Sequence, residues 1–153
     1  EEIQSVRSQL KVLQDKLIDL TDKDAEAFAP LSAAYGLPKD TEEQKAAKAR
    51  IMEGALYDAS VVPIEIMETV LEGMRLLKIL GEKGSRIAVS DVGVGVLFAQ
   101  AALEGASLNV FINTKLMKDR GRAEKLNQKT ESMIAEGREW KEIIYRDVLG
   151  HIQ

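Results

Sequence analysis

Apolar residues recur at helical spacing along nearly the whole chain, and this periodicity restricts the fold more than any other feature. In the first segment the intervals alternate between three and four residues, through Ile3, Val6, Leu10, Leu13, Leu17 and Leu20. Such spacing keeps one face of an α-helix apolar and is typical of bundles and coiled coils. Strand signals are weak, because aromatic residues make up only 5% of the chain. The sequence therefore predicts an all-α protein.

A second helix is predicted from about residue 41. Asp40 or Thr41 can cap its start, and Glu43 or Gln44 stands where a capping box needs its second member. Pro63 interrupts the apolar pattern, but the pattern resumes in phase after it. We therefore expect Pro63 to bend this helix rather than end it.

The remaining segments predict three further helices, which makes an antiparallel bundle of about five. Ser90 or Asp91 can cap a helix that ends near Gly105, and its residues are apolar on nearly every side, as in a central buried helix. A short helical segment at residues 107–117 follows, and Asp119 can cap the last helix. Long helices joined by short loops are typical of antiparallel bundles.

Length and composition limit the class of protein. The 153 residues are enough for one domain, and 45% hydrophobic with 30% charged residues is an ordinary soluble mixture. Because the chain has no cysteine and one histidine, His151, we expect no metal site and no histidine triad. The net charge of −4 argues against a nucleic-acid binder, and the absence of a run of 18 apolar residues argues against a membrane span. We expect a cytoplasmic protein that binds neither nucleic acid nor membrane.

Asp24 continues the first apolar stripe at a position where the pattern calls for an apolar residue. Pro30 lies six residues further on, so we expect a helix kink close to this carboxylate. One interpretation is a partly buried carboxylate with a raised pKa, which can serve as a general acid or base. The other is a surface aspartate, or a buried one that the backbone or an arginine compensates.

Ser90 and Asp91 mark a predicted helix start, where free backbone N–H groups attract anions. An ordinary N-cap is the simpler explanation of the pair. The preceding loop contains Lys83 and Arg86, which can hold an anionic part of a ligand or can be solvated surface charges.

Asn109 and Asn113 are polar residues in an apolar setting, beside Leu108, Val110 and Phe111. They are four residues apart, so both lie on one helical face. Buried amides need hydrogen-bond partners. The two side chains can orient a polar heterocycle, or they can form caps and bonds between helices.

Five short motifs, in order along nearly the whole chain, carry a resemblance to a known family. They are residues 22–28 (DKDAEAF), 37–43 (LPKDTEE), 62–63 (VP), 90–91 (SD) and 109–113 (NVFIN). Together they resemble the formiminotetrahydrofolate cyclodeaminase / methenyltetrahydrofolate cyclohydrolase family. The resemblance implies an all-α, dimeric, folate-binding enzyme that needs no metal and no redox cofactor.

The resemblance implies one of two reactions on a tetrahydrofolate derivative. The first converts 5-formiminotetrahydrofolate to 5,10-methenyltetrahydrofolate with release of ammonia. The alternative hydrolyses the methenyl compound to 10-formyltetrahydrofolate. Asp24 would be the main acid/base, and Asp91 a second carboxylate that orients or shares the proton. Five further residues would bind substrate, three at the pterin-like ring and two at the glutamate tail: Ser90, Asn109, Asn113, Lys83 and Arg86.

Relatives in this family carry a glycine-rich G-G-G-S segment in an additional helix ahead of the point where this chain starts. We therefore expect residues 1–153 to form a single cyclodeaminase-like domain without that N-terminal helix. This difference keeps a second interpretation open, a non-catalytic helical interaction protein. The stripes at both ends predict a homodimer through the Ile3–Leu20 face, with the Ala123–Ile144 face as a second contribution. The active site would lie near or across that interface, close to Asp24.

Overall fold

The computed structural model describes residues 1–153 and consists of four long α-helices and one short 3-10 turn. The elements are α1 (Glu2–Tyr35), α2 (Glu42–Lys83), the 3-10 turn η1 (Arg86–Ala88), α3 (Val89–Leu116) and α4 (Arg120–Ile152). The all-α prediction is confirmed. The expected number of about five helices is one too many, because residues 107–117 do not form a separate helix.

The sequence predicted a helix end near Gly105, but α3 continues through this residue without interruption. A glycine inside a helix costs about 1 kcal/mol relative to alanine, which is small beside the tertiary packing of a long helix. Leu103 precedes Gly105, Ala106 and Val110 follow it, and all three are buried in one core cluster. Ending the helix at Gly105 would turn these side chains away from that cluster, so packing decides the local structure.

Two predicted helix caps are confirmed. Thr41 accepts a hydrogen bond from the Gln44 backbone N–H at 3.2 Å, and the Gln44 side chain accepts one from the Thr41 N–H, which completes a capping box. Asp119 accepts a hydrogen bond from the Arg122 N–H at 2.9 Å at the start of α4.

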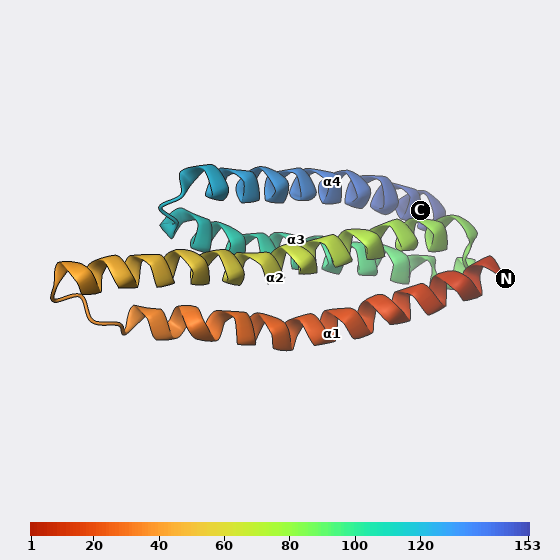
Figure 1. Cartoon of the computed structure of the whole chain (residues 1–153). Helices are drawn as coiled ribbons and strands as arrows, with labels where there is room; N and C mark the ends of the chain where they lie inside the picture. Colours follow the sequence, from red (N-terminus) through yellow and green to blue (C-terminus); the bar gives the residue numbers. More distant parts are fainter.

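The four helices run antiparallel and form an elongated bundle (Figure 1). α2 packs against α1, α3 and α4, whereas α1 makes extensive contact only with α2. Both chain termini lie at one end of the bundle (Figure 1). At the other end the α1–α2 hairpin reaches beyond the α3–α4 hairpin, because α2 has 42 residues and α3 has 28.

The apolar stripe of α1 packs on α2 and is not a free surface. Val6 and Leu13 are buried and form a cluster with Leu76 of α2. The stripe of α4 is likewise buried within the chain. The prediction that the Ile3–Leu20 and Ala123–Ile144 faces form a dimer interface is therefore wrong, because the chain itself covers both.

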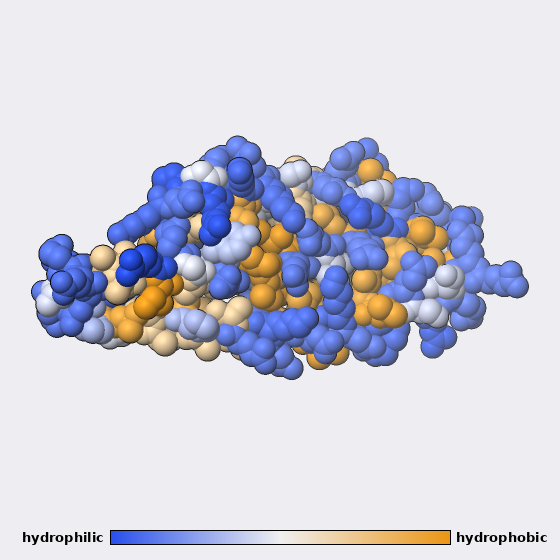
Figure 2. Space-filling view, viewed as in Figure 1, coloured by the Kyte–Doolittle hydropathy of each residue, from blue (hydrophilic) through white to orange (hydrophobic).

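α3 is buried on one side only, so it is not the fully buried central helix that its composition predicted. On its outer face, Phe98 is 73%, Leu108 67% and Ile112 63% exposed. Apolar patches also interrupt the polar surface on the side of the molecule that Figure 2 shows. By length and composition alone, Arg86–Leu116 is apolar enough to cross a membrane, a property that core helices of soluble proteins share.

Candidate functional site

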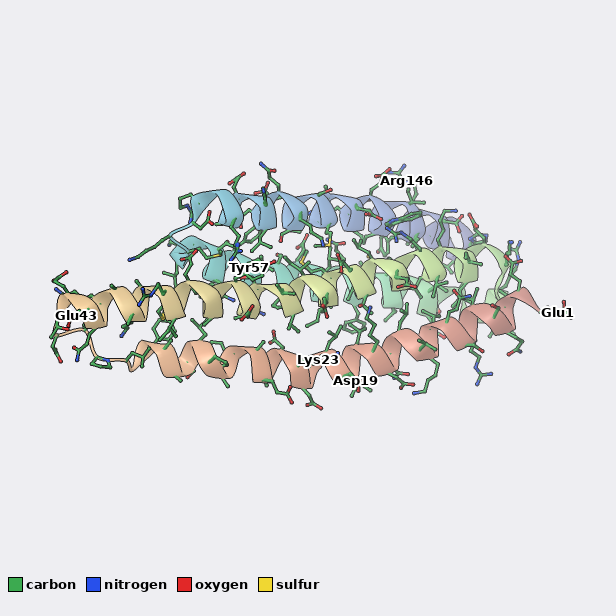
Figure 3. All side chains as sticks on the ribbon, in the orientation of Figure 1. Glu1, Asp19, Lys23, Glu43, Tyr57 and Arg146 are labelled. Carbon is green, nitrogen blue, oxygen red and sulfur yellow. The ribbon has the colours of Figure 1, made fainter.

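Asp24 lies about two thirds of the way along α1, one residue after Lys23, which Figure 3 labels. It continues the inward-facing stripe between the buried residues Leu20 and Leu31, and its own side chain is partly buried. Partial burial withdraws water from the carboxylate and raises the pKa of Asp24 above its ordinary value. The predicted direction of this pKa shift is confirmed.

The pairing of α1 with α2 determines which residues lie level with Asp24. Leu13 of α1 lies beside Gly73 of α2, with its Cδ1 4.0 Å from the place a Cβ would take. Asp24 is eleven residues further along α1, and α2 runs in the opposite direction. Asp24 therefore lies level with Val62 and Pro63, eleven or ten residues back along α2.

Pro63 is linked to Asn113 through the carbonyl group of Ala59. Inside a helix this carbonyl would accept a hydrogen bond from the N–H four residues on, but Pro63 has no N–H. Asn113 of α3 donates its side-chain N–H to the Ala59 carbonyl instead, at 3.1 Å. This bond compensates for the missing helical one, and α2 continues through Pro63 as expected. It also brings Asn113 within one helical turn of the level of Asp24.

An apolar groove between α1, α2 and α3 ends one turn from Asp24. Its volume is about 490 Å³, and most of its lining is hydrophobic, including Leu17 and Phe98. Thr21 of α1 and Thr69 of α2 form the end nearest Asp24, and both hydroxyls donate to carbonyls of their own helices. The size and apolar lining suit a planar organic ligand, whose polar edge would reach Asp24.

Asn109 lies on the flank of α3 that borders this groove. It is seven residues after Ala102, a groove-lining residue, so two helical turns bring it to the same side. Its side chain is exposed, and it lies within one turn of the level of Asp24. By helix register, Asp24, Asn109 and Asn113 therefore lie within about one helical turn of one another along the bundle, beyond the Thr21 end of the groove and outside its lining.

Asp91 lies near the end of the bundle that carries the chain termini. It lines a cavity of about 350 Å³ together with Ile3 of α1. Asp24 is 21 residues beyond Ile3, which is about 32 Å along an α-helix. Within one chain, Asp24 and Asp91 are therefore too far apart to share a proton, and that prediction is wrong.

Ser90 and Asp91 do not cap α3. Its N-cap is Ala88, because η1 starts the helix earlier than the sequence predicted. Both side chains are exposed in the first turn of α3. A carboxylate in the first turn is stabilised by the positive end of the helix dipole. Neither side chain packs in the core.

Lys83 and Arg86 lie at the same end of the molecule as Asp91. Lys83 forms an ion pair with Glu2 at 2.6 Å, and Arg86 is exposed in η1. Within one chain, neither cation is close to Asp24. Their assignment to the anionic tail of a ligand remains a prediction.

Sequence reasoning missed the groove itself. Thr21 stands three residues before Asp24 and directly follows Leu20 of the stripe, so it was a readable signal of a polar site at this part of α1. The groove, however, depends on the distance between α1 and α3, and residue periodicity carries no information on that distance. No group of three or more His, Cys, Asp or Glu side chains is placed to hold a metal ion.

Comparison with known proteins gives a consistent result. The sequence model of the formiminotransferase-cyclodeaminase family matches residues 1–132. Methenyltetrahydrofolate cyclohydrolase of Methylorubrum extorquens is 38% identical over 147 residues, which cover 96% of this chain and 71% of that protein. Formimidoyltransferase-cyclodeaminase of Mus musculus is 33% identical over 123 residues, 80% of this chain but 23% of that protein. The corresponding protein of Gallus gallus is 33% identical over 120 residues, 78% of this chain and 21% of that protein.

Proposed function

The chain belongs to the formiminotransferase-cyclodeaminase family, as its five motifs predicted, and from that premise we propose that it is an enzyme acting on a tetrahydrofolate derivative. The observation that carries this proposal is a partly buried carboxylate with a raised pKa, Asp24, at the end of an apolar groove. A site of this kind offers a planar ligand an apolar cleft and one titratable group.

Of the two reactions, hydrolysis of 5,10-methenyltetrahydrofolate to 10-formyltetrahydrofolate has the stronger support. The cyclohydrolase relative matches nearly the whole chain at 38% identity. The sequence favoured the cyclodeaminase reaction on 5-formiminotetrahydrofolate. That reaction remains the second candidate, because several relatives named formimidoyltransferase-cyclodeaminase match about four fifths of the chain.

Asp24 supplies the proton transfers that the hydrolysis requires. As water adds to the methenyl carbon, its oxygen forms the new C–O bond and the carboxylate accepts one of its protons. The bond from that carbon to N5 then breaks, N5 takes a proton, and the hydroxyl proton leaves as the formyl C=O forms. One proton is released in total. A positioned carboxylate with a pKa moved toward neutrality contributes typically 100- to 10,000-fold to such a step.

The same carboxylate fits the cyclodeaminase chemistry. In that reaction N10, the attacking nitrogen, loses a proton, and the leaving formimino nitrogen gains one before ammonia departs. Asp24 can accept the first proton and deliver the second. In either reaction the groove would hold the aromatic part of the folate, and Asn109 would bind its polar edge.

The test is turnover by Asp24→Asn, followed through the near-ultraviolet absorbance of methenyltetrahydrofolate. We expect kcat to fall by about 100- to 10,000-fold while the fold is kept, because Asn cannot transfer a proton. Asp19→Asn is the matched control: Asp19 is an exposed carboxylate on the same helix, labelled in Figure 3. Wild-type kcat in Asp24→Asn would contradict the assignment of Asp24.

The same experiment separates the candidate functions. Ammonia release from the formimino substrate would identify a cyclodeaminase, and decay of the methenyl substrate without it a cyclohydrolase. Decay no faster than buffer, with no thermal shift on adding folate, would favour the non-catalytic interaction protein. We also propose that the protein acts as a cytoplasmic homodimer without metal or cofactor, and light scattering tests the dimer directly.

A further inference from the structure

A hollow lies at the end of the bundle where the α1–α2 hairpin reaches beyond the α3–α4 hairpin. Its volume is about 330 Å³, and its walls come from the end of α1, one face of α2 and the turn between α3 and α4. Four of its ten lining residues are lysines, Lys39, Lys45, Lys48 and Lys118, and the only acidic one is Glu53. We call this hollow the lysine pocket. In a chain with 25 acidic and 21 basic residues, it is a local concentration of positive charge.

The unequal lengths of the helices create the lysine pocket. Asn113 of α3 bonds to the Ala59 carbonyl, so Leu116, the last residue of α3, lies level with Leu56 of α2. The α2 residues before Leu56 extend past the end of α3, as Figure 1 shows. Leu56 is buried, whereas Lys48, eight residues earlier on the same face, lines the open part. This face of α2 therefore changes from apolar to basic where α3 stops covering it.

Glu53 does not neutralise the lysines of the pocket. Its two carboxylate oxygens accept hydrogen bonds from the backbone N–H groups of Lys118 and Asp119, at 2.7 and 3.0 Å. These bonds hold the turn before α4 against α2 and so position Lys118 at the pocket. The side chains of Lys39 and Lys118 are exposed and take part in none of the ion pairs of the chain. Both ammonium groups are therefore available to a ligand.

The other two lysines differ in how they are held. The Lys48 ammonium donates to the carbonyls of Tyr35 and Leu37 at the end of α1, at 2.7 and 2.9 Å. An ammonium group has three N–H donors, so one remains for a ligand. Lys45 pairs with Glu42 at 2.7 Å on the exposed surface. Such surface pairs contribute little free energy, so a more highly charged anion can displace Glu42.

The pocket also has an apolar wall. Tyr35 is 51% and Leu116 49% exposed, and both line the pocket together with Met52. Figure 2 shows apolar atoms beside strongly hydrophilic ones at this end of the molecule. A ligand that matches both walls carries several negative charges next to a flat or apolar body. No arginine lines the pocket, and lysine ammonium groups bind phosphate as point charges, without the paired geometry that arginine offers to a carboxylate.

We propose that the lysine pocket binds a small organic anion with two or more phosphate or carboxylate groups, for example a nucleoside triphosphate. The anionic groups lie between Lys39, Lys118 and the remaining donor of Lys48, and the apolar body packs on Tyr35. This site is separate from the apolar groove, and it does not depend on the proposed function.

Two sources can supply such an anion. One is a free phosphate ester. The other is an anionic tail on the ligand of the groove, because Leu56 at the edge of the pocket is six residues from Val62, which lies level with Asp24. Six residues correspond to about 9 Å along a helix, a distance that an extended tail can span. Only this second source rests on the proposed function.

Isothermal titration calorimetry with ATP at low ionic strength tests the site. ATP should bind more tightly than ADP and ADP more tightly than AMP, and added salt should weaken all three, because the attraction follows the number of charges. Lys39→Ala and Lys118→Ala should each weaken ATP binding about tenfold, since each removes a charge-assisted hydrogen bond. The turn is kept in Lys118→Ala, because Glu53 binds the backbone N–H of this residue and not its side chain.

Lys23→Ala is the matched control for the change in net charge. Lys23 is an exposed lysine of α1 that lies outside the pocket and forms no ion pair, and Figure 3 labels it. Its removal should change the affinity for ATP by no more than about twofold, because salt screens a distant charge. Equal weakening by Lys23→Ala and the two pocket variants would overturn the site.

Inorganic tripolyphosphate and a triglutamate peptide distinguish the two sources. Binding of ATP or tripolyphosphate that both pocket variants weaken identifies a phosphate site, and binding of triglutamate alone identifies a site for a carboxylate tail. Tyr35→Leu should weaken ATP but not tripolyphosphate, because only ATP has a ring to pack on the tyrosine. If none of the three anions binds at millimolar concentration, the proposal is wrong. The titrations require no turnover, so they stand or fall independently of the role of Asp24.

Discussion

The inner and outer faces of α3 each carry a line of apolar residues and have opposite environments. Val96, Leu103 and Val110 form a line with heptad spacing on the inner face, and none has any exposed surface. Val94 and Leu108 lie on a corresponding line of the outer face, and both are more than half exposed. The inner line packs against α2 and α4, while the outer line has no cover within the chain.

This difference between the two faces shows what can be inferred from a helix that is apolar on every side. The composition of such a helix predicts that both faces are buried, and the chain provides cover for only one. An exposed apolar strip along a whole helix is unusual on a soluble monomer. The comparison can be tested by making matched changes on the two faces and asking which one costs folding and which one costs association.

The largest effect is expected from Leu103→Ala on the inner face. A fully buried leucine leaves a cavity when it is truncated, so the free energy of unfolding should fall by about 2–5 kcal/mol. Leu108→Ala removes the same atoms from the outer face and should cost less than about 1 kcal/mol in dilute solution, where the chain is single. Thermal unfolding at several protein concentrations measures both, because the effect of Leu108→Ala should grow as the dimer becomes populated.

A similar cost for the two leucine variants at the lowest concentration would contradict the difference between the faces. It would mean that some part of the chain covers the outer line in solution. The inner variant serves as the internal calibration, since its cost does not depend on association.

The next largest effect is expected at two glycines, Gly137 of α4, which lies against the inner face of α3, and Gly105 on the outer face of α3. A Cβ at Gly137 of α4 would lie 2.6 Å from Cδ2 of the buried Leu103, so Gly137→Ala should destabilise the fold by about 1–2 kcal/mol net of its better helix propensity. Gly105→Ala meets no atom and should stabilise the single chain by about 1 kcal/mol. Urea unfolding of dilute protein checks the opposite signs.

A smaller effect is expected at the two asparagines. Asn113→Ala removes the donor to the Ala59 carbonyl and should lower the free energy of unfolding by about 1 kcal/mol. Asn109→Ala should leave stability within about 0.5 kcal/mol, because its side chain is exposed, and should raise KM for the folate substrate. Melting curves measure the structural role of Asn113, and steady-state kinetics measure the binding role of Asn109. An unchanged KM in Asn109→Ala would remove this residue from the site.

Much of the fold could be predicted from local rules. Helical periodicity located α1, α2 and α4, and the side chains of Thr41 and Asp119 marked two helix starts. These features depend on neighbours within a few residues, so the sequence alone carries them. The wrong boundary at Gly105 is a place where long-range packing overrides a local preference.

The site could be predicted only in part, because it depends on distances between helices. Asp24 was identified by a break in a stripe, and its raised pKa agrees with that interpretation. The link between Pro63 and Asn113 could not be foreseen, since it joins residues 50 positions apart through a third one, Ala59. The stripe pattern also cannot state which helix covers a face, which is why the predicted dimer face was wrong.

The smallest expected effect concerns the pH dependence of stability at Asp24, on the face of α1 that borders the groove. Burial raises the pKa of Asp24 in the folded state above its unfolded value near 3.8, so the ionised carboxylate destabilises the fold at neutral pH. Asp24→Asn should therefore raise Tm by about 2 °C at pH 7. That advantage should fade as the pH falls through the raised pKa, because the wild-type carboxyl then takes up its proton, and it should be absent below about pH 4.

Glu104 provides the control of opposite sign. Hydrogen bonds from Gln100 and Arg138 lower its pKa, so Glu104→Gln should lower Tm at pH 7 and lose its effect in acid. If Asp24→Asn lowered Tm at pH 7, the carboxylate would be a stabilising group of the fold, and its place in a strained site beside the groove would have to be abandoned.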